Sequence, residues 1–362
     1  MKAGDLARLR LNALMIGKPD AQSPAELVAR LCAMQGQDYA GTLWAIGLRL
    51  NAGSRADIES AVAAGTIVRS WPLRSTLHFV AAADLRWMLT LLGPRLISAS
   101  AGRNRQLELT ESDFSRSRTI LSRALEGGTS LTRAEAFEKL NGGGVSTAGQ
   151  RGTHILHRLS LEKLLCFGPH RGKQPTFVLF DEWVIDGADY SREESLRNLA
   201  ERYFRSHGPA RIEDFINWSG LTVTDAKAGL KLTERILQAI TVDDRKYWMS
   251  NDAGQPLPLT TGGYLLPGFD EFLLGYRDRS AVLSPEHADA VCPGGNGMFR
   301  ATLVLDGQVC GTWKAVTRRT NVTISASLFR PLRSAEIDGF DAARRRYEDF
   351  VGLPVSIEWP SA

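Results

Sequence analysis

Two glutamines that are two positions apart, Gln35 and Gln37, have the type and spacing of a small polar working site. They lie in the sequence Gln35-Gly36-Gln37-Asp38, directly before an aromatic residue, Tyr39. One helical pattern precedes this segment and another follows it, so apolar side chains are the usual choice here. Burying a carboxamide without hydrogen-bond partners costs roughly 1 to 3 kcal/mol. Water, backbone or substrate must therefore satisfy these amides.

A second polar group lies on a predicted strand at residues 75–80. Alternation places Arg74, Thr76 and His78 on one face of that strand, with apolar residues largely on the other. Two interpretations stay open: these side chains serve the working site, or they form the wing of a DNA-contacting module or cap a neighbouring helix. A lone histidine such as His78 is more often a satisfied structural residue than a base.

Other patterns that carry chemistry are missing. The sequence has no Walker loop, no GxSxG, no HExxH and no dinucleotide fingerprint, and the glycines at 142–144 follow a helix rather than a strand. The cysteines lie far apart, without a spacing suited to zinc, and are expected to be reduced core thiols: Cys32, Cys166, Cys292 and Cys310. We expect no metal and no cofactor.

Three helices followed by a two-stranded hairpin is the order of a winged helix. This order occurs three times along the chain. A capping box at Ser23 opens the first helix, which is expected to run into residues 35–38. A second capping box at Thr132 opens another helix. Further helices are expected at residues 40–50, 57–64, 116–126, 146–163, 191–207, 211–218 and 224–231. Strands are expected at residues 67–71, 75–80, 164–167, 176–180, 236–242 and 246–249.

These patterns predict an α+β protein with three tandem winged-helix units and a small C-terminal domain. The units are expected at residues 1–100, 101–187 and 188–255, and the C-terminal domain at 256–362. The last domain should be mostly β and barrel-like, because residues 301–313 form a hairpin around an Asp306-Gly307 turn. A strand at 321–328 and a helix at 334–351 follow it.

Positive charge is spread unevenly along the chain. The net charge is only +4, but residues 86–133 hold eight arginines against four acidic residues, and residues 151–173 hold five basic residues against Glu162 alone. Such local fields attract polyanions, most often nucleic acid. Solvated faces that keep a protein soluble explain the same pattern equally well, so charge alone leaves both interpretations open.

Length and hydropathy place the chain in a broad class. A chain of 362 residues exceeds the size at which single cores stop growing, so two or more domains are expected. Residues 1–11 carry Arg8 and Arg10 in an amphipathic pattern and lack the apolar core of a signal peptide. No stretch has the uninterrupted apolar length of a membrane span. We expect a cytoplasmic protein without a membrane partner.

Four blocks of sequence carry a family resemblance. They are residues 34–49, residues 69–80 (RSWPLRSTLHFV), residues 266–279 (LPGFDEFLLGYRDR) and residues 296–313. In this order, over nearly the whole chain, they resemble the bacterial tandem winged-helix DNA glycosylases of the AlkZ and YcaQ type. In that family a Gln-aliphatic-Gln motif, or Gln-aliphatic-Asp in the YcaQ branch, supports the water that hydrolyses the N-glycosidic bond of an alkylated purine.

The resemblance implies that Gln35 and Gln37 are the catalytic pair, with the second glutamine placing the chain nearer the AlkZ branch. Gly36 stands where the family has an aliphatic residue. Neutral amides suit a cationic lesion, because an N7-alkylguanine already carries positive charge and leaves without protonation by a strong acid. The enzyme then orients water and stabilises oxocarbenium character at the sugar.

The resemblance also implies a substrate and a partner: double-stranded DNA with bulky N7-alkylguanine adducts or interstrand crosslinks made by DNA-alkylating natural products, bound by a monomer. Candidate substrate- and DNA-binding residues are Asp38, Tyr39, Arg69, Arg74, Thr76, His78, Arg151, Arg171, Lys173, Arg277 and Arg279. For Arg277 and Arg279 an internal ion-pair cluster is an equal alternative. For Arg151, His154, His157 and Arg158, on a predicted helix, phosphate contact and a solvated face are equal alternatives.

A second functional hypothesis needs no catalysis. A winged-helix DNA-binding protein or transcription regulator would use only the helical units and the basic faces. Sequence-specific binding to undamaged duplex would distinguish it from a glycosylase. A symmetric regulator would normally carry a dimerisation element, and the sequence shows neither coiled-coil heptads nor a long terminal helix.

Overall fold

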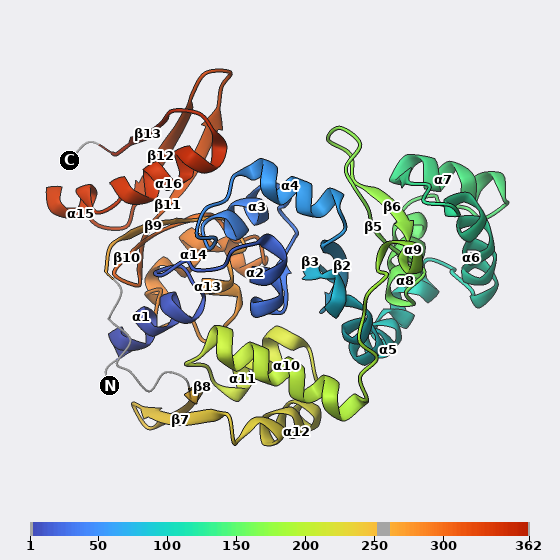
Figure 1. Ribbon diagram of the computed structural model, residues 1–362, viewed down its shortest axis with the longest axis horizontal. Helices are drawn as coiled ribbons and strands as arrows, with labels where there is room; N and C mark the ends of the chain where they lie inside the picture. The colour runs from blue at the N-terminus through green and yellow to red at the C-terminus, as the bar shows by residue number, and fades with distance from the viewer. Residues whose placement is uncertain (1–2, 252–260, 361–362) are drawn as a thin grey trace. The chain divides into compact units, whose positions relative to one another are not determined.

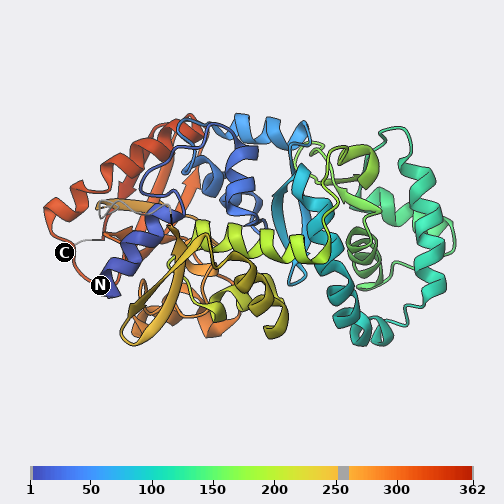
Figure 2. The same cartoon turned by 60° about the horizontal axis from the view of Figure 1, so that its bottom comes forward.

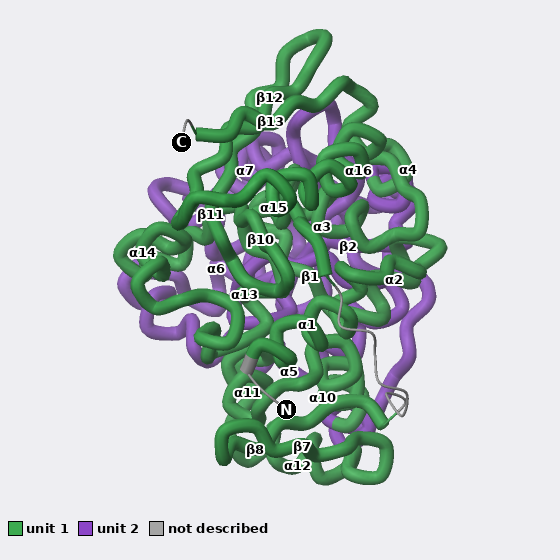
Figure 3. Tube along the Cα trace, turned by 90° about the vertical axis from the view of Figure 1, so that its left-hand side faces the viewer, with its two compact units in different colours: residues 1–58, 197–362 green, residues 59–196 purple. Residues whose placement is uncertain are grey.

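The computed structural model describes residues 3–251 and 261–360, and Figures 1 and 2 show its helices and strands. The chain forms two compact units (Figure 3). The first unit consists of residues 1–58 and 197–362, and the second unit consists of residues 59–196. None of the helices in the described residues combines the length and the apolar character that a membrane crossing requires.

The first unit opens with the elements that lead to Gln35: α1 (Ala3–Ala13), α2 (Pro24–Leu31), β1 (Met34–Gln35) and α3 (Tyr39–Gly47). As predicted, the Ser23 side chain caps α2 by accepting a hydrogen bond from the Glu26 N–H. The helix ends at Leu31 because Cys32 adopts a φ of +67°. The prediction that this helix runs into residues 35–38 is therefore wrong. The chain passes from the first unit to the second within α4 (Arg55–Ala63).

The second unit alternates hairpins with helices. Its elements are β2 (Ile67–Leu73), β3 (Thr76–Ala81), α5 (Ala82–Gln106), α6 (Glu111–Leu125), β4 (Leu131–Thr132), α7 (Arg133–Gly142), α8 (Arg151–Leu161), β5 (Leu165–Phe167), β6 (Thr176–Leu179) and α9 (Phe180–Trp183). β4, β6 and β5 form one antiparallel sheet in that order. The predicted capping box at Thr132 is present. The 25-residue helix α5 was not predicted.

The core of the second unit lies between its last three long helices and the β5–β6 hairpin. Phe114 and Leu121 of α6, Leu140 of α7 and Leu159 of α8 are all buried in one cluster. Trp71 of β2 packs against this cluster. The expected order of helices followed by a hairpin is therefore present over residues 111–179.

The order of helices and hairpin occurs again at residues 192–250, where the chain returns from the second unit to the first. α10 (Arg192–His207), α11 (Ile212–Ser219) and α12 (Val223–Thr233) precede the antiparallel strands β7 (Leu237–Val242) and β8 (Arg245–Ser250). Figure 2 shows these strands as a long two-stranded ribbon in gold. α11 ends where Gly220 adopts the left-handed conformation, with a φ of +72°.

The C-terminal part of the first unit is a five-stranded half-barrel sheet. Its strands are β9 (Gly263–Leu266), β10 (Thr302–Leu305), β11 (Gln308–Thr317), β12 (Val322–Leu328) and β13 (Val355–Glu358), in the order β13-β12-β11-β10-β9. The predicted Asp306-Gly307 turn joins β10 to β11. α13 (Glu271–Leu274), η2 (Pro285–His287), α14 (Ala288–Val291) and η3 (Pro293–Gly295) lie between β9 and β10, and α15 (Ser334–Asp338) and α16 (Asp341–Val351) precede β13. α16 packs against β9 and β13.

The mixed α+β fold is confirmed. The assignment of three winged-helix units and the four domain ranges remain predictions. The expected boundary at residues 255 and 256 lies outside the described residues. The range 1–100, expected as one unit, is shared by both compact units.

Candidate active site

The loop that carries the two glutamines is held through its backbone. Asp38 caps α3, because its side chain accepts a hydrogen bond from the Gly41 N–H at 3.1 Å. The Thr42 hydroxyl lies 2.8 Å from the Gln35 carbonyl oxygen and 2.6 Å from the Asp38 carbonyl oxygen. A hydroxyl has one proton, so it donates to these two acceptors in turn or shares the proton between them. Thr42 therefore ties both ends of the loop to α3.

A buried acid holds the loop from the other side. The Gln35 N–H donates to Oε1 of Glu271 at 3.1 Å. Glu271 is only 2% exposed, and its Oε2 accepts a hydrogen bond from Nε1 of Trp218 at 3.0 Å. Nε2 of His207 lies 3.4 Å from the same oxygen. In the first unit, α13, which carries Glu271, therefore lies against the segment that carries Gln35; Figure 1 labels both α13 and α3.

A buried ion pair fixes the residue that precedes Glu271. The Arg49 guanidinium donates to both oxygens of Asp270, at 2.8 and 2.9 Å, and both side chains are almost completely buried. Nε of Arg49 also donates to the Leu14 carbonyl oxygen at 2.8 Å. Asp270 caps α13 by accepting from the Phe272 N–H at 2.9 Å. Because this pair is bidentate, it fixes the orientation of the α13 start as well as its position.

The backbone of the loop is anchored, but the side chains of the two glutamines are not part of that anchoring. Gln35 is half-buried and Gln37 is exposed. In the part of the first unit that the structure describes, neither carboxamide has a hydrogen-bond partner. Each offers one carbonyl oxygen and two N–H groups. Asp38 uses its carboxylate as a helix cap, and Tyr39 is half-buried at the first position of α3. The loop thus presents neutral polar groups on a fixed backbone.

The family model described as "DNA glycosylase AlkZ-like" matches residues 28–350. The chain belongs to this family. It is therefore an enzyme of the DNA glycosylase class, which hydrolyses N-glycosidic bonds in DNA. The match includes the glutamine loop, α13 and most of the C-terminal sheet.

Two further comparisons agree with the family. The chain is similar to the interstrand DNA cross-link repair glycosylase of Streptomyces sahachiroi, with 29% identity over 351 residues that cover 89% of this chain and 90% of that protein. The solved structure of Streptomyces sahachiroi DNA glycosylase AlkZ matches with a TM-score of 0.81 and 24% identity, covering 99% of this chain and 100% of that chain. The second match shows a shared fold.

The two arginines predicted after α13 differ in their surroundings. Arg279 is tied to its own unit, because its Nε donates to the Leu273 carbonyl oxygen at 2.7 Å and its guanidinium lies 4.8 Å from the centre of the Phe299 ring. Arg277 has an exposed side chain, and its backbone N–H donates to Asp214 at 2.9 Å. Arg279 is thus bound within its own unit, whereas the Arg277 side chain is exposed; a DNA contact for either arginine stays a prediction.

The hairpin residues of the second unit do not share one polar face. Arg74 and Ser75 form the turn between β2 and β3, with φ of +52° and +60°, so the strand begins only at Thr76. The Thr76 hydroxyl donates to the Leu73 carbonyl oxygen at 3.1 Å. His78 is fully buried, with Nδ1 2.9 Å from the Thr76 carbonyl oxygen. The turn ends one residue later than predicted, so Arg74 is not on the strand, whereas Thr76 and His78 keep the expected two-residue spacing on β3.

The basic loop between β5 and β6, residues 168–175, lies near Arg69 in the second unit. The Arg69 guanidinium is 5.2 Å from the centre of the Phe167 ring, and burial, followed by the charge of Arg69, lowers the pKa of His170. Arg171 is held by Glu135, with Nη1–Oε1 2.7 Å. Lys173 is exposed at the loop tip. Arg69 therefore lies near the base of the loop that carries Arg171 and Lys173.

α8 directs several of its predicted contact residues into the second unit. Nη1 of Arg151 donates to the carbonyl oxygens of Leu107 and Glu108, at 2.5 and 2.9 Å. The His157 ring meets Trp71 edge-on at 5.4 Å. Burial, followed by the charge of His154, lowers the pKa of His157 to about 4. These side chains connect α8 to the α5–α6 loop and to β2.

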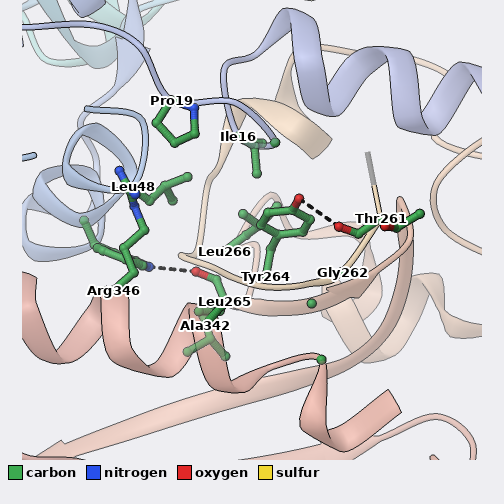
Figure 4. Close-up of a pocket in the computed structure, with 15 residues that line it drawn as sticks. Ile16, Pro19, Leu48, Thr261, Gly262, Tyr264, Leu265, Leu266, Ala342 and Arg346 are labelled. Carbon is green, nitrogen blue, oxygen red and sulfur yellow. Dashed lines mark hydrogen bonds between the residues drawn. The ribbon is translucent and has the colours of Figure 1, made fainter. Parts of the chain in front are cut away.

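A pocket of about 270 Å³ lies elsewhere in the first unit, between α3, α16 and β9 (Figure 4). Trp44, Leu48, Tyr264 and Arg346 are among its lining residues, and neither catalytic candidate is one of them. Nε1 of Trp44 donates to the Leu265 carbonyl oxygen at 2.7 Å, and burial raises the pKa of Tyr264 to about 12. The pocket is mostly a gap beside a packed aromatic core, and the glutamine loop remains the candidate site.

The sequence did not predict the roles of Glu271 and Thr42 at the glutamine loop. The available signal for Glu271 was the pair Asp270-Glu271 inside the apolar run of residues 265–274. Charged residues in such a run are almost never buried unless they are paired. That pattern predicts a buried charged cluster, but it does not name the backbone group of Gln35 as its partner.

Proposed function

We propose that Gln35 and Gln37 are the catalytic pair of a monofunctional DNA glycosylase that excises alkylated purines. The observation that carries this proposal is the state of their side chains: two carboxamides without partners in the described part of the first unit, on a loop whose backbone is anchored by Glu271 and Thr42. An anchored loop whose polar side chains have no protein partner can present them to a ligand or a transition state.

The chemistry suits neutral side chains. Water attacks C1′ of the nucleotide while the bond from C1′ to N9 breaks, and the bond's electron pair neutralises the cationic base as it leaves. One glutamine carbonyl oxygen accepts a hydrogen bond from the water, and the other lies toward the developing oxocarbenium ion. The water's second proton passes to solvent after attack. Positioning and electrostatic stabilisation supply the rate, so no strong acid is required.

The substrate class we propose is bulky N7-alkylguanine, including interstrand crosslinks made by DNA-alkylating natural products. One support is the name of the Streptomyces sahachiroi relative, an interstrand DNA cross-link repair glycosylase. Another is the exposure of Gln37, since a bulky adduct cannot enter the tight pocket that many base-flipping enzymes use. The role would be DNA repair or self-resistance.

Double-stranded DNA is the proposed partner, bound by a monomer in the cytoplasm. Three winged helices, each ending in one of the hairpins β2–β3, β5–β6 and β7–β8, would hold the duplex through phosphate contacts that position it without reading sequence. Arg69, Arg277 and Lys173 are better candidates for these contacts than Arg151, because the Arg151 guanidinium is already bound to backbone carbonyl oxygens. Asp38 acts by shaping the loop.

The test is excision from a duplex that contains a single N7-alkylguanine, with hot alkali cleaving the abasic product. Wild-type protein should give strand breaks, and Gln37→Ala should lower the single-turnover rate about 100-fold, the size expected when one preorganised group is lost. Gln35→Ala should act similarly. An absence of product from wild type on both a methyl and a bulky adduct, at enzyme excess, would refute the proposal and favour the DNA-binding alternative.

A further inference from the structure

Glu271 is a buried carboxylate whose two oxygens have different duties. Oε1 accepts the backbone N–H of Gln35 at 3.1 Å. Oε2 accepts Nε1–H of Trp218 at 3.0 Å and faces Nε2 of His207 at 3.4 Å. A carboxylate is an acceptor only, so the His207 tautomer with a proton on Nε2 fits this contact. Oε1 therefore contacts the glutamine loop, and Oε2 contacts side chains of α10 and α11.

Burying the Glu271 carboxylate costs free energy, so its presence is poorly explained if the side chain only fills space in the core. A buried carboxylate is expensive to remove from water unless several donors compensate. The Arg49–Asp270 pair fixes the start of α13 and thereby fixes the place from which Glu271 reaches the loop. The result is a chain of contacts in one unit, from Arg49 through Asp270 and Glu271 to Gln35.

We infer that Glu271 is a positioning residue for excision: it holds the Gln35 backbone so that the Gln35 carboxamide faces the sugar. This inference rests on the proposed function of Gln35. Loss of the acceptor removes the hydrogen bond that fixes the Gln35 N–H, whereas Thr42 still holds the carbonyl oxygens of Gln35 and Asp38. A displacement near 1 Å at a reacting group costs on the order of 100-fold in rate, so the effect should fall on the chemical step and leave DNA binding unchanged.

The competing explanation is structural: Glu271 serves only to satisfy Trp218 and His207. The two explanations separate in a Trp218→Phe background, which removes the donor to Oε2. In that background Glu271→Gln can turn its amide oxygen to the Gln35 N–H and its NH₂ to Nε2 of His207. For this, His207 takes the tautomer with its proton on Nδ1, which lies 2.8 Å from the Ser206 hydroxyl. Glu271→Met has a similar length and no acceptor for Gln35.

The experiment compares four proteins: wild type, Trp218→Phe, Trp218→Phe/Glu271→Gln and Trp218→Phe/Glu271→Met. The readouts are the single-turnover excision rate on N7-alkylguanine duplex, the Kd for the same duplex and the Tm. We expect the methionine double variant to excise about 100-fold more slowly than Trp218→Phe, with the glutamine double variant within about fivefold of it. The Kd should change by less than about threefold in every variant.

Equal rates in the two double variants would overturn the inference, because the acceptor for Gln35 would then not matter. A loss that appears in Kd, or a loss of rate in Trp218→Phe alone as large as in the methionine double variant, would overturn it in favour of the structural explanation. An inactive wild type would instead refute the proposed function, and this inference with it.

Discussion

Replacing Asp270 with asparagine should destabilise the first unit strongly. The Arg49 and Asp270 side chains are 0% and 2% exposed, and two hydrogen bonds of 2.8 and 2.9 Å join them. Asp270→Asn keeps the shape but leaves the Arg49 charge buried opposite an NH₂ group. Breaking a buried pair by removing one partner costs about 3 to 5 kcal/mol. At about 2–4 °C per kcal/mol for a unit of this size, Tm should fall by roughly 6 to 20 °C.

Urea unfolding of Asp270→Asn, followed by tryptophan fluorescence, measures this loss against a matched control. Asp20 and Arg30 form a pair in the same unit at 2.6 Å, with side chains 52% and 45% exposed, so Asp20→Asn should cost only about 0 to 1 kcal/mol. The double variant Arg49→Met/Asp270→Leu should be more stable than Asp270→Asn, because it leaves no unpaired charge. A loss in Asp270→Asn no larger than in Asp20→Asn would refute the reasoning.

Three more predictions concern the loop, pH and DNA. Gly41→Ala places a methyl group 2.6 Å from Oδ2 of Asp38, so it should dislodge that cap and lower the excision rate more than DNA affinity; an unchanged rate would count against the anchored loop. The pKa of His157 is lowered to about 4 by burial, so the unfolded state binds more protons below pH 6.5. Stability should therefore fall by roughly 2 to 3 kcal/mol as pH drops from 6.5 to 4, and urea midpoints of His157→Phe should lack this part of the pH dependence. Lys173→Ala should weaken duplex binding and reduce the salt slope of log Kd by about 1, whereas Glu135, which pairs with Arg171, should tolerate Gln in the same assay.

Local patterns predicted most of the helices, because capping residues mark where they begin. Ser23 and Thr132 accept the N–H groups that the sequence assigned to them. Helix ends were less predictable: Cys32 stops α2 by adopting a positive φ of +67°, which glycine adopts more readily than other residues. The long helix α5 was missed because Gly93 and Pro94 lie inside it, where both residues normally argue against a helix.

The position of the glutamine loop could be predicted, but its anchoring could not. Gln35 and Glu271 are separated by 236 residues, and no periodicity links them. The prediction that Arg74 lies on the same strand face as Thr76 and His78 was wrong for a different reason. Arg74 and Ser75 form a turn with two positive φ values. Neither residue type predicts such a turn, since these turns usually contain Asn or Gly.

The proposed function gives the glutamine loop a neutral chemistry, and the acids around the loop fit that proposal. Asp38 is held as the cap of α3, Asp270 neutralises Arg49, and Glu271 has donors on both oxygens. Each carboxylate is thus engaged in holding the backbone, and the groups that the loop presents outward are carboxamides. A carboxamide cannot protonate a leaving base at neutral pH, so under the proposed function excision depends on a base that already carries positive charge. Such a dependence would protect normal purines even at an exposed site, because undamaged bases would leave too slowly.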